Sequence, residues 1–285
     1  MFSKIHAYLE MIKFQHTVFA LPFALTAAIV AAGGIPEWRV LGWILVAMFG
    51  ARSAAMGFNR IVDRHYDARN PRTAERELPT GKISLSTAIT LTALCAALFL
   101  YAAHCLNSLA FSLSFPTLLV LFFYSYTKRF TDYSHFVLGL CLGIAPVGAW
   151  VAVRGELSPI PAVLTVAVLL WAAGFDIIYS TLDVDFDRKA GLHSMVRRLG
   201  VAGGLKLAKR LHFFFVVALV AFGFVAGLGP FFFIGVGLIG FLLFVEHGLV
   251  SPDDLTRVNI AFFNINGIIS ALVMVMTLID VWMQR

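Results

Sequence analysis

Long apolar runs separated by short polar segments make up nearly the whole chain. A run of about 20 apolar residues is long enough for one helix to cross the hydrocarbon core of a lipid bilayer. The pattern predicts nine such helices, at residues 17–34, 40–60, 86–104, 108–126, 134–153, 161–181, 211–228, 231–249 and 258–282. The expected fold is therefore an all-α membrane protein in which residues 1–285 form a single domain, a bundle of about nine transmembrane helices.

The segment before the first apolar run, residues 1–16, has the pattern of an amphipathic helix. One side of it carries Phe2, Ile5, Leu9 and Ile12, and Lys4 and Lys13 lie elsewhere. This arrangement predicts an interfacial helix on the membrane surface. The alternative is a secretory signal peptide, because the alanines within residues 27–32 resemble a cleavage region. The eight later spans and the lack of a compact basic start favour the interfacial helix.

Composition supports a membrane protein over a soluble one. The chain is 60% hydrophobic and 13% charged, with a mean hydropathy of +0.86, which is too apolar for an ordinary soluble domain. Cys95, Cys105 and Cys141 fall within predicted spans and form no CxxC pair. They are expected to pack as small apolar residues rather than to bind metal or form disulfides.

Lysine and arginine gather on one side of the predicted bundle. The amino-terminal segment and the loops after the second, fourth and sixth helices hold Lys4, Lys13, Arg60, Arg64, Arg69, Arg72, Arg76, Lys82, Lys128, Arg129, Arg188, Lys189, Arg197, Arg198, Lys206, Lys209 and Arg210. The other side has Arg39, Arg154 and the terminal Arg285. The positive-inside rule then predicts a cytoplasmic amino terminus and an outer carboxyl terminus, in a bacterial-type inner membrane. The net charge of +6 follows largely from this topology, so no nucleic-acid partner is expected.

The stretch NRIVDRHYD ends the second predicted helix and places polar side chains on one of its faces. At about 100° per residue, Asn59, Asp63 and Asp67 fall within an arc of about 80°. Arg52 lies in the same arc, two turns deeper. A carboxylate near the bilayer centre costs about 3 kcal/mol, so such a face is expected to line a cavity, bind a cation or both. The alternative is that both aspartates lie outside the bilayer, solvated beside loop arginines.

A second acidic stretch, DIIYSTLDVDFD, ends the sixth predicted helix. Asp176, Asp183 and Asp187 share one helical face there. Asp185 points to the opposite side, where it is expected to be solvated. Because both acidic helix ends lie on the predicted cytoplasmic side, their carboxylates are expected to converge.

Carboxylates that converge in this way suit a hard divalent cation. Mg²⁺ in particular is held by a few carboxylates together with phosphate oxygens. The loops at residues 61–85 and 183–210 follow the acidic ends and are expected to cap the site on the cytoplasmic side. Basic residues there and at the end of the fourth helix are Arg64, Arg72, Lys128, Arg129, Lys189 and Arg198. Carboxylates, a cation and basic side chains together indicate a diphosphate site, and scattered histidines make a zinc site less favoured.

Several spaced motifs resemble those of the UbiA-type intramembrane aromatic prenyltransferases. NRIVDRHYD matches the NxxxDxxxD motif of that family, and DVDFD, with Asp176 and Tyr179 upstream, is similar to its second aspartate-rich motif. YSYTK resembles the YxxxK element, NPRTAERELPTGKIS the loop after the first motif, and HTVFALPFA the first helix. The resemblance covers about residues 4–270. It looks closest to 4-hydroxybenzoate polyprenyltransferases and the related enzymes of the futalosine route to menaquinone.

The resemblance implies a polyprenyltransferase that uses Mg²⁺, a polyprenyl diphosphate and an aromatic acid acceptor. The implied metal ligands are Asn59, Asp63, Asp67, Asp183 and Asp187. The implied catalytic residues are Asp63, Asp67, Asp183, Asp187 and Lys128. The implied substrate-binding residues are Asn59, Arg52, Arg64, Arg72, Tyr124, Arg129, Asp176, Tyr179, Lys189 and Arg198. Lys128 and nearby arginines would neutralise the departing diphosphate, and two tyrosine rings, Tyr124 and Tyr179, would shield the allyl cation.

Arg52 is the residue expected to bind the acceptor. Its guanidinium lies deep on the acidic face, where the carboxylate of an aromatic acid would fit its planar fork. The alternative is a structural pair with Asp63 or another acid of the bundle. Both 4-hydroxybenzoate and 1,4-dihydroxy-6-naphthoate carry such a carboxylate, so the expected pathway is ubiquinone or menaquinone biosynthesis.

Other functions fit the pattern less well. A membrane transporter also buries acids on facing helices, but near the bilayer midplane rather than at helix ends among arginines. A phosphatidyl-type transferase would carry an Asp-Gly-x-x-Ala-Arg signature, which the chain lacks. Haem farnesyltransferases and lipid-ether synthases share the aspartates, because these bind the diphosphate and not the acceptor. A last polar set, Asn259, Asn266 and Ser270, either lines the cavity or makes hydrogen bonds between helices.

Overall fold

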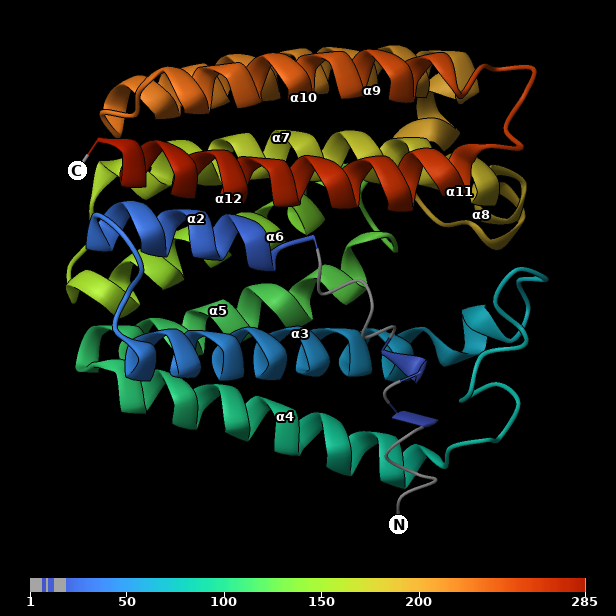
Figure 1. Cartoon of the computed structure of the whole chain (residues 1–285). Coiled ribbons are helices and arrows are strands. Elements are labelled where there is room, and N and C mark those ends of the chain that lie inside the picture. The colour runs from blue at the N-terminus through green and yellow to red at the C-terminus, as the bar shows by residue number, and fades with distance from the viewer. Residues whose placement is uncertain (1–6, 9, 13–18, 285) are drawn as a thin grey trace.

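The computed structural model describes residues 7, 8, 10–12 and 19–284, and these are largely helical (Figure 1). The helices are α2 (Leu21–Ala32), α3 (Trp38–Asp67), α4 (Leu85–Leu106), α5 (Ser108–Thr127), α6 (Ser134–Arg154), α7 (Pro159–Ser180), η2 (Thr181–Asp183), α8 (Val184–Ala190), α9 (Met195–Val225), α10 (Pro230–Gly248), α11 (Val258–Ile260), η3 (Ala261–Ile265) and α12 (Asn266–Met283). The described residues form no β-strand. The predicted all-α class is confirmed.

Within the described residues, eight helical segments are long and apolar enough to cross a membrane. They correspond to the second through ninth predicted spans. Helix α2 occupies the place of the first, but its 12 residues are fewer than the roughly 20 that a full crossing needs. It ends at Gly33, whose φ of 62° is a left-handed conformation that favours glycine. The predicted start of that span, at residue 17, lies outside the described residues.

The expected interfacial helix at residues 1–16 also lies largely outside the described residues. Those of its residues that are described pack against the protein, with Tyr8 and Met11 buried beside Ile83. The Tyr8 hydroxyl donates a hydrogen bond of 3.1 Å to the backbone oxygen of Ser53 in α3. This hydrogen bond connects the described part of the segment to α3, the helix that carries the first acidic motif.

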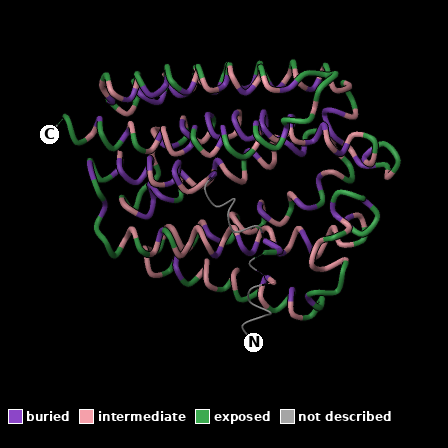
Figure 2. The backbone as a smooth tube through the Cα atoms, turned by 45° about the vertical axis from the view of Figure 1, so that its right-hand side comes forward, coloured by how far each residue is buried: buried purple, intermediate pink, exposed green. Residues whose placement is uncertain are grey.

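The helices run roughly parallel in stacked layers, with α9 and α10 along one edge and α3, α4 and α5 along the other (Figure 1). Helix α7 packs in the centre of the bundle. In the apolar stretch of the span that it forms, 56% of the residues are buried, the largest fraction among the eight spans. Its Trp171 and Phe175 pack with Phe23 of α2 and Phe215 of α9 in the main core. Exposed residues instead follow the outer sides of α9 and α10 (Figure 2). Apolar examples such as Phe244, which is 74% exposed, are expected to contact lipid.

Two glycines bring α6 and α7 unusually close together. A Cβ atom on Gly139 would lie 2.4 Å from the backbone oxygen of Leu169, and one on Gly143 would lie 2.8 Å from the backbone oxygen of Thr165. This is the spacing of a GxxxG motif, which lets two helix backbones approach in a membrane. The Thr165 hydroxyl also donates a hydrogen bond of 2.6 Å to the Gly143 oxygen. The contact sets the position of α7, whose far end carries the second acidic motif.

A buried polar network joins α7, α10 and α12 away from the acidic motifs. The Trp171 indole donates to the side-chain oxygen of Asn266, and the Asn266 amide donates to Glu246 at 2.9 Å. The same amide donates to the backbone oxygen of Ala261 at 3.0 Å, in the single π-helical turn η3. Of the last polar set singled out in the sequence, Asn266 therefore makes hydrogen bonds between helices, whereas Asn259 is exposed.

Candidate active site

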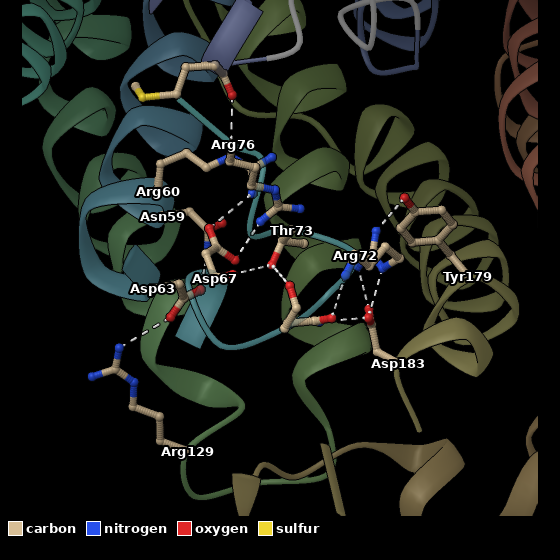
Figure 3. Close-up of polar contacts among 12 residues, drawn as sticks. Asn59, Arg60, Asp63, Asp67, Arg72, Thr73, Arg76, Arg129, Tyr179 and Asp183 are labelled. Carbon is tan, nitrogen blue, oxygen red and sulfur yellow. Dashed lines mark hydrogen bonds and ion pairs between the residues drawn. The ribbon is translucent and has the colours of Figure 1, made fainter. Parts of the chain in front are cut away.

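At the end of α3, the polar residues of the first acidic motif recur every four residues, about one helical turn apart. The Asn59 amide donates a hydrogen bond of 2.9 Å to Asp63 Oδ2, four residues later. Asp67 is the last residue of α3 and is buried. The polypeptide then enters the loop at residues 68–84, which carries further arginines across the same face (Figure 3).

The end of α7 is tightened by two hydroxyl side chains. Ser180 donates a hydrogen bond of 2.8 Å to the backbone oxygen of Ile177, and Thr181 one of 2.7 Å to that of Ile178. Side-chain bonds of this kind compete with the helical ladder and bend the backbone. Here the helix tightens into the 3₁₀ turn η2 before α8 begins.

This break turns the second acidic motif inward. Asp183 and Asp187 are buried, whereas Asp185 is exposed, as its position on the opposite side predicts. Helix α8 ends after seven residues at Gly191, which has a φ of 72°. Two carboxylates of the motif therefore face the protein and one faces away from it.

Arg72 connects the loop after the first motif to the second motif (Figure 3). Its Nε donates a hydrogen bond of 2.8 Å to Asp183 Oδ1, its Nη2 donates to Asp183 Oδ2, and its Nη1 donates to the Tyr179 hydroxyl at 2.9 Å. The Asn70 amide adds a bond of 3.0 Å to Asp183 Oδ1. Burial alone would lower the pKa of Arg72, but the bond and charge of Asp183 outweigh this and raise it. The guanidinium is therefore charged at neutral pH.

The first motif is held by arginines in a similar way. Arg76 Nη1 donates a hydrogen bond of 2.6 Å to Asp67 Oδ1, and Arg129 Nη2 approaches Asp63 Oδ1 at 3.2 Å. Arg129 also donates at 3.0 Å to the backbone oxygen of Val62. Asp63, Asp67 and Asp183 thus each have an arginine partner from a loop outside the two motifs. Arg60, within the first motif, also lies 4.0 Å from Asp67 Oδ2.

Lys128 lies immediately after α5 and faces the same acids. Burial alone would lower the pKa of its ammonium, but the surrounding carboxylates, Asp187 and Asp176 foremost, outweigh this and raise it. The backbone oxygen of Lys128 accepts a hydrogen bond of 2.7 Å from the backbone N–H of His193. The loop after α8 therefore fixes the end of α5 that carries this cation.

These side chains line one charged cavity of about 180 Å³. Its wall includes eleven residues that the sequence marks as site residues, namely Asn59, Asp63, Asp67, Arg72, Tyr124, Lys128, Arg129, Asp176, Tyr179, Asp183 and Asp187. A second cavity, of about 190 Å³ and mostly apolar, lies between helices that include α3, α5 and α6. Asn59 and Tyr124 line both cavities, so the two adjoin at these residues.

The remaining sequence-predicted residues lie elsewhere. Arg52 lines the apolar cavity rather than the charged one. Three others are not part of either wall. Arg64 donates to the backbone oxygen of Ile61 at 2.8 Å, Lys189 is exposed, and Arg198 is 54% exposed, 3.9 Å from Asp132.

Several lining residues were missed by the motif analysis. They include Arg60, Tyr66, Asn70, Thr73, Arg76, Ser125 and Ser180. The nearest signal was the loop stretch NPRTAERELPTG, in which Arg72 and Arg76 are four residues apart. A loop has no periodicity from which the direction of such side chains follows.

The donor set fits a divalent cation that also binds phosphate. Among the described residues, no three His, Cys, Asp or Glu side chains converge closely enough to hold a metal on their own. Asp67 Oδ2 and Asp187 Oδ2 are nevertheless buried without a hydrogen-bond partner in the described part of the chain. A cation that takes only one or two protein carboxylates and completes its shell with phosphate oxygens, as Mg²⁺ does, suits two such oxygens.

Comparison with known proteins places these features in a family. A model described as the UbiA prenyltransferase family matches residues 20–268. The 4-hydroxybenzoate octaprenyltransferase of Vibrio cholerae is 30% identical over 287 residues, which cover 98% of this chain and 99% of that protein. The protein of the same name from Marinobacter nauticus is 34% identical over 224 residues, covering 78% and 76%.

Solved structures agree with this assignment. A UbiA homolog from Aeropyrum pernix K1 superimposes with a TM-score of 0.85 at 32% identity, covering 93% of this chain and 98% of that one. A UbiA homolog from Archaeoglobus fulgidus, solved with DMAPP and Mg²⁺, gives a TM-score of 0.75 at 21% identity, covering 96% and 99%. The second likeness concerns the fold alone.

Proposed function

Because the chain belongs to the UbiA prenyltransferase family, we propose that it transfers a polyprenyl group from an allylic diphosphate to an aromatic carboxylate such as 4-hydroxybenzoate. The new bond forms at the ring carbon ortho to a hydroxyl, and the reaction depends on Mg²⁺. That the protein is an integral membrane polyprenyltransferase follows from the family and its apolar helices. One observation supports the finer proposal: two acidic helix ends and five basic side chains line a cavity that adjoins an apolar one.

The acidic residues have the role of metal ligands in this proposal. Asn59, Asp63, Asp67, Asp183 and Asp187 would hold Mg²⁺ at the charged cavity. A bound Mg²⁺ neutralises charge on the diphosphate and so assists its departure from the allyl carbon. Two buried carboxylate oxygens that accept no hydrogen bond in the described part of the chain, one from each motif, support this assignment.

The basic residues bind the diphosphate directly. The Lys128 ammonium lies among carboxylates and remains charged, since its pKa is raised. Arg72 and Arg129 present planar guanidinium forks, which match phosphate oxygens as well as they match carboxylates. When the metal and the diphosphate enter together, each arginine exchanges a carboxylate partner for a phosphate oxygen.

The apolar cavity suits the reacting end of the isoprenoid and excludes water. An allyl cation formed near water would be quenched to an alcohol, so a dry wall favours transfer. The rings of Tyr124, which lines both cavities, and of Tyr179, which lines the charged one, stabilise positive charge through their faces. Tyr179 is held in place by Phe262, stacked at 4.2 Å between ring centroids, and by Arg72.

Arg52 binds the carboxylate of the acceptor. It lines the apolar cavity two helical turns deeper than Asn59, one of the residues at which the two cavities adjoin. An aromatic acid anchored there would hold its ring toward the allyl carbon. The names of the relatives support 4-hydroxybenzoate. The alternative acceptor, 1,4-dihydroxy-6-naphthoate, also carries a carboxylate and a hydroxyl on its aromatic ring system. The product would enter ubiquinone or menaquinone biosynthesis at the cytoplasmic face of an inner membrane.

The acceptor is tested by offering the candidate acids separately. Membranes containing the protein receive a labelled allylic polyprenyl diphosphate and Mg²⁺, together with 4-hydroxybenzoate, 1,4-dihydroxy-6-naphthoate, its 2-naphthoate isomer or no acceptor. We expect a labelled prenylated product from one of these acids and none without acceptor. Product from none of them, with the protein verified as folded, would contradict the proposed acceptor class.

A further inference from the structure

Asp176 differs in its partner from three other acids of the charged cavity. Asp63, Asp67 and Asp183 each lie within hydrogen-bond distance of an arginine. Asp176 Oδ2 instead lies 2.6 Å from Nδ1 of His135, a side chain that is completely buried. No lysine or arginine in the described part of the chain forms an ion pair with Asp176.

The hydrogen bonds around His135 define its tautomer. The backbone N–H of Met195 donates to His135 Nε2 at 3.3 Å, so that nitrogen is an acceptor and carries no proton. The ring proton is therefore on Nδ1 and is donated to Asp176 Oδ2. This bond holds the Asp176 carboxylate in one orientation, with a buried imidazole rather than an arginine as its partner.

Asp176 also lies deeper than the other acids of its helix. It precedes Asp183 by seven residues, or about 10 Å along a helix. Its side chain is 16% exposed and lines the charged cavity together with Asn59 and Tyr124, the two residues that also line the apolar cavity. If the proposed function holds, on which this inference rests, this is the place where the allyl carbon meets the aromatic ring.

We infer that Asp176 is the base that accepts the proton lost by the aromatic ring, and that His135 is the residue that positions it. The C–O bond to the diphosphate breaks and its electron pair leaves with the diphosphate. A bond forms between the allyl carbon and the ring carbon ortho to the hydroxyl. The C–H bond at that carbon then breaks, its electron pair restores the aromatic ring, and the proton moves to the carboxylate oxygen that does not face His135.

The first test compares the wild type with Asp176→Asn. The amide oxygen of asparagine still accepts the hydrogen bond from His135, but the side chain is no base. We expect kcat to fall about 100- to 10,000-fold, the range for loss of a general base, with little change in diphosphate KM. A primary isotope effect should also appear when the acceptor is deuterated at both carbons ortho to its hydroxyl, because ring deprotonation becomes rate-limiting.

Three results would overturn the inference. They are an unchanged kcat in Asp176→Asn, a large fall in kcat without any isotope effect, and loss of Mg²⁺-dependent diphosphate binding, which would make the residue a ligand. The acceptor is whichever of 4-hydroxybenzoate and the dihydroxynaphthoates the wild type prenylates. A wild type that prenylates none of them would refute the proposed function itself, whereas equal activity of the two proteins would refute this inference alone.

The positioning role is tested at His135. His135→Gln supplies both an amide N–H for Asp176 and an oxygen for the Met195 N–H, whereas His135→Leu supplies neither. We expect His135→Leu to lose kcat and to show the same isotope effect as Asp176→Asn, and glutamine to restore most of the rate. Diphosphate binding verifies that each variant is folded. Equal kcat in the leucine and glutamine variants would overturn the positioning role.

Discussion

At the scale of single residues, the charged cavity holds acids and bases that satisfy one another. Asp183 accepts from Arg72 and Asn70, and Asp67 accepts from Arg76. Such pairs keep buried carboxylates from being left unpaired, which costs several kcal/mol per charge. They also keep the arginines in place for an incoming diphosphate, whose oxygens can then replace the carboxylates as their partners.

The role of Arg72 leads to a prediction about diphosphate affinity. Arg72→Ala removes charge-assisted hydrogen bonds and is expected to raise the KM for the polyprenyl diphosphate about 10- to 100-fold. Lys82→Ala is the matched control, because Lys82 is an exposed cation of the same loop. Steady-state kinetics with the acceptor at saturation measure both. The same diphosphate KM in both variants would contradict the role.

The role of Arg52 leads to a prediction about the acceptor. Arg52→Ala is expected to raise the acceptor KM about 10- to 100-fold, since a hydrogen-bonded charge pair is lost, and to leave the diphosphate KM nearly unchanged. Arg39→Ala, at an exposed position near the start of the same helix, controls for loss of a charge. An equal rise in both KM values would instead show that Arg52 is a structural partner within the bundle.

At the scale of helices, hydropathy predicted where spans occur but not how their ends are shaped. The predicted span at 161–181 agrees with α7, because a long apolar run has few alternatives to a membrane helix. The break at η2 depends on the hydroxyls of Ser180 and Thr181, which donate hydrogen bonds to backbone oxygens three residues earlier. The periodicity of apolar residues does not predict such bonds. Helix α9 similarly begins at Met195, well before the predicted 211–228, and kinks at Gly200.

The close approach of α6 and α7 gives a prediction about stability. In Gly139→Ala the new methyl group would meet the Leu169 backbone at 2.4 Å, so the helices must separate. We expect a loss of about 1–3 kcal/mol in the free energy of unfolding, the usual range for overpacking. Gly148→Ala in the same helix meets no atom within 4 Å and serves as the control. Thermal unfolding in detergent compares them, and equal melting temperatures would contradict the packing argument.

At the scale of the whole molecule, the acids of the site were predictable and most of their partners were not. The position of Asn59, Asp63 and Asp67 on one helical face follows from the helical period alone, whichever residues surround them. The bond between Arg72 and Asp183 joins residues 111 positions apart, and no local pattern encodes such a contact. His135 was missed for the same reason, since a lone histidine in an apolar span gives no sign of the carboxylate that it contacts.

The distribution of basic residues predicts the orientation of the whole bundle. Glu75→Cys lies in the loop after the first acidic motif and Glu156→Cys at the opposite end, and both positions are exposed. With a cytoplasmic amino terminus, a membrane-impermeant maleimide should label Cys at 156 from the outer face and Cys at 75 only after permeabilisation. The wild type, with its three native cysteines, gives the background. The reverse labelling pattern would contradict the orientation.

The most direct test of the account is prenyl transfer by two variants of one motif. Asp183→Asn changes a buried acid of the charged cavity, and Asp185→Asn makes the same change at an exposed position two residues later. With labelled polyprenyl diphosphate, Mg²⁺ and the aromatic acid, Asp185→Asn should form product like the wild type. In Asp183→Asn the rate of product formation should fall at least about 100-fold, as expected when charge stabilisation at the reacting centre is removed. EDTA should abolish product formation in every variant. Equal rates in the two variants, or product formation that survives EDTA, would contradict the central claim that these convergent acids act through a divalent cation.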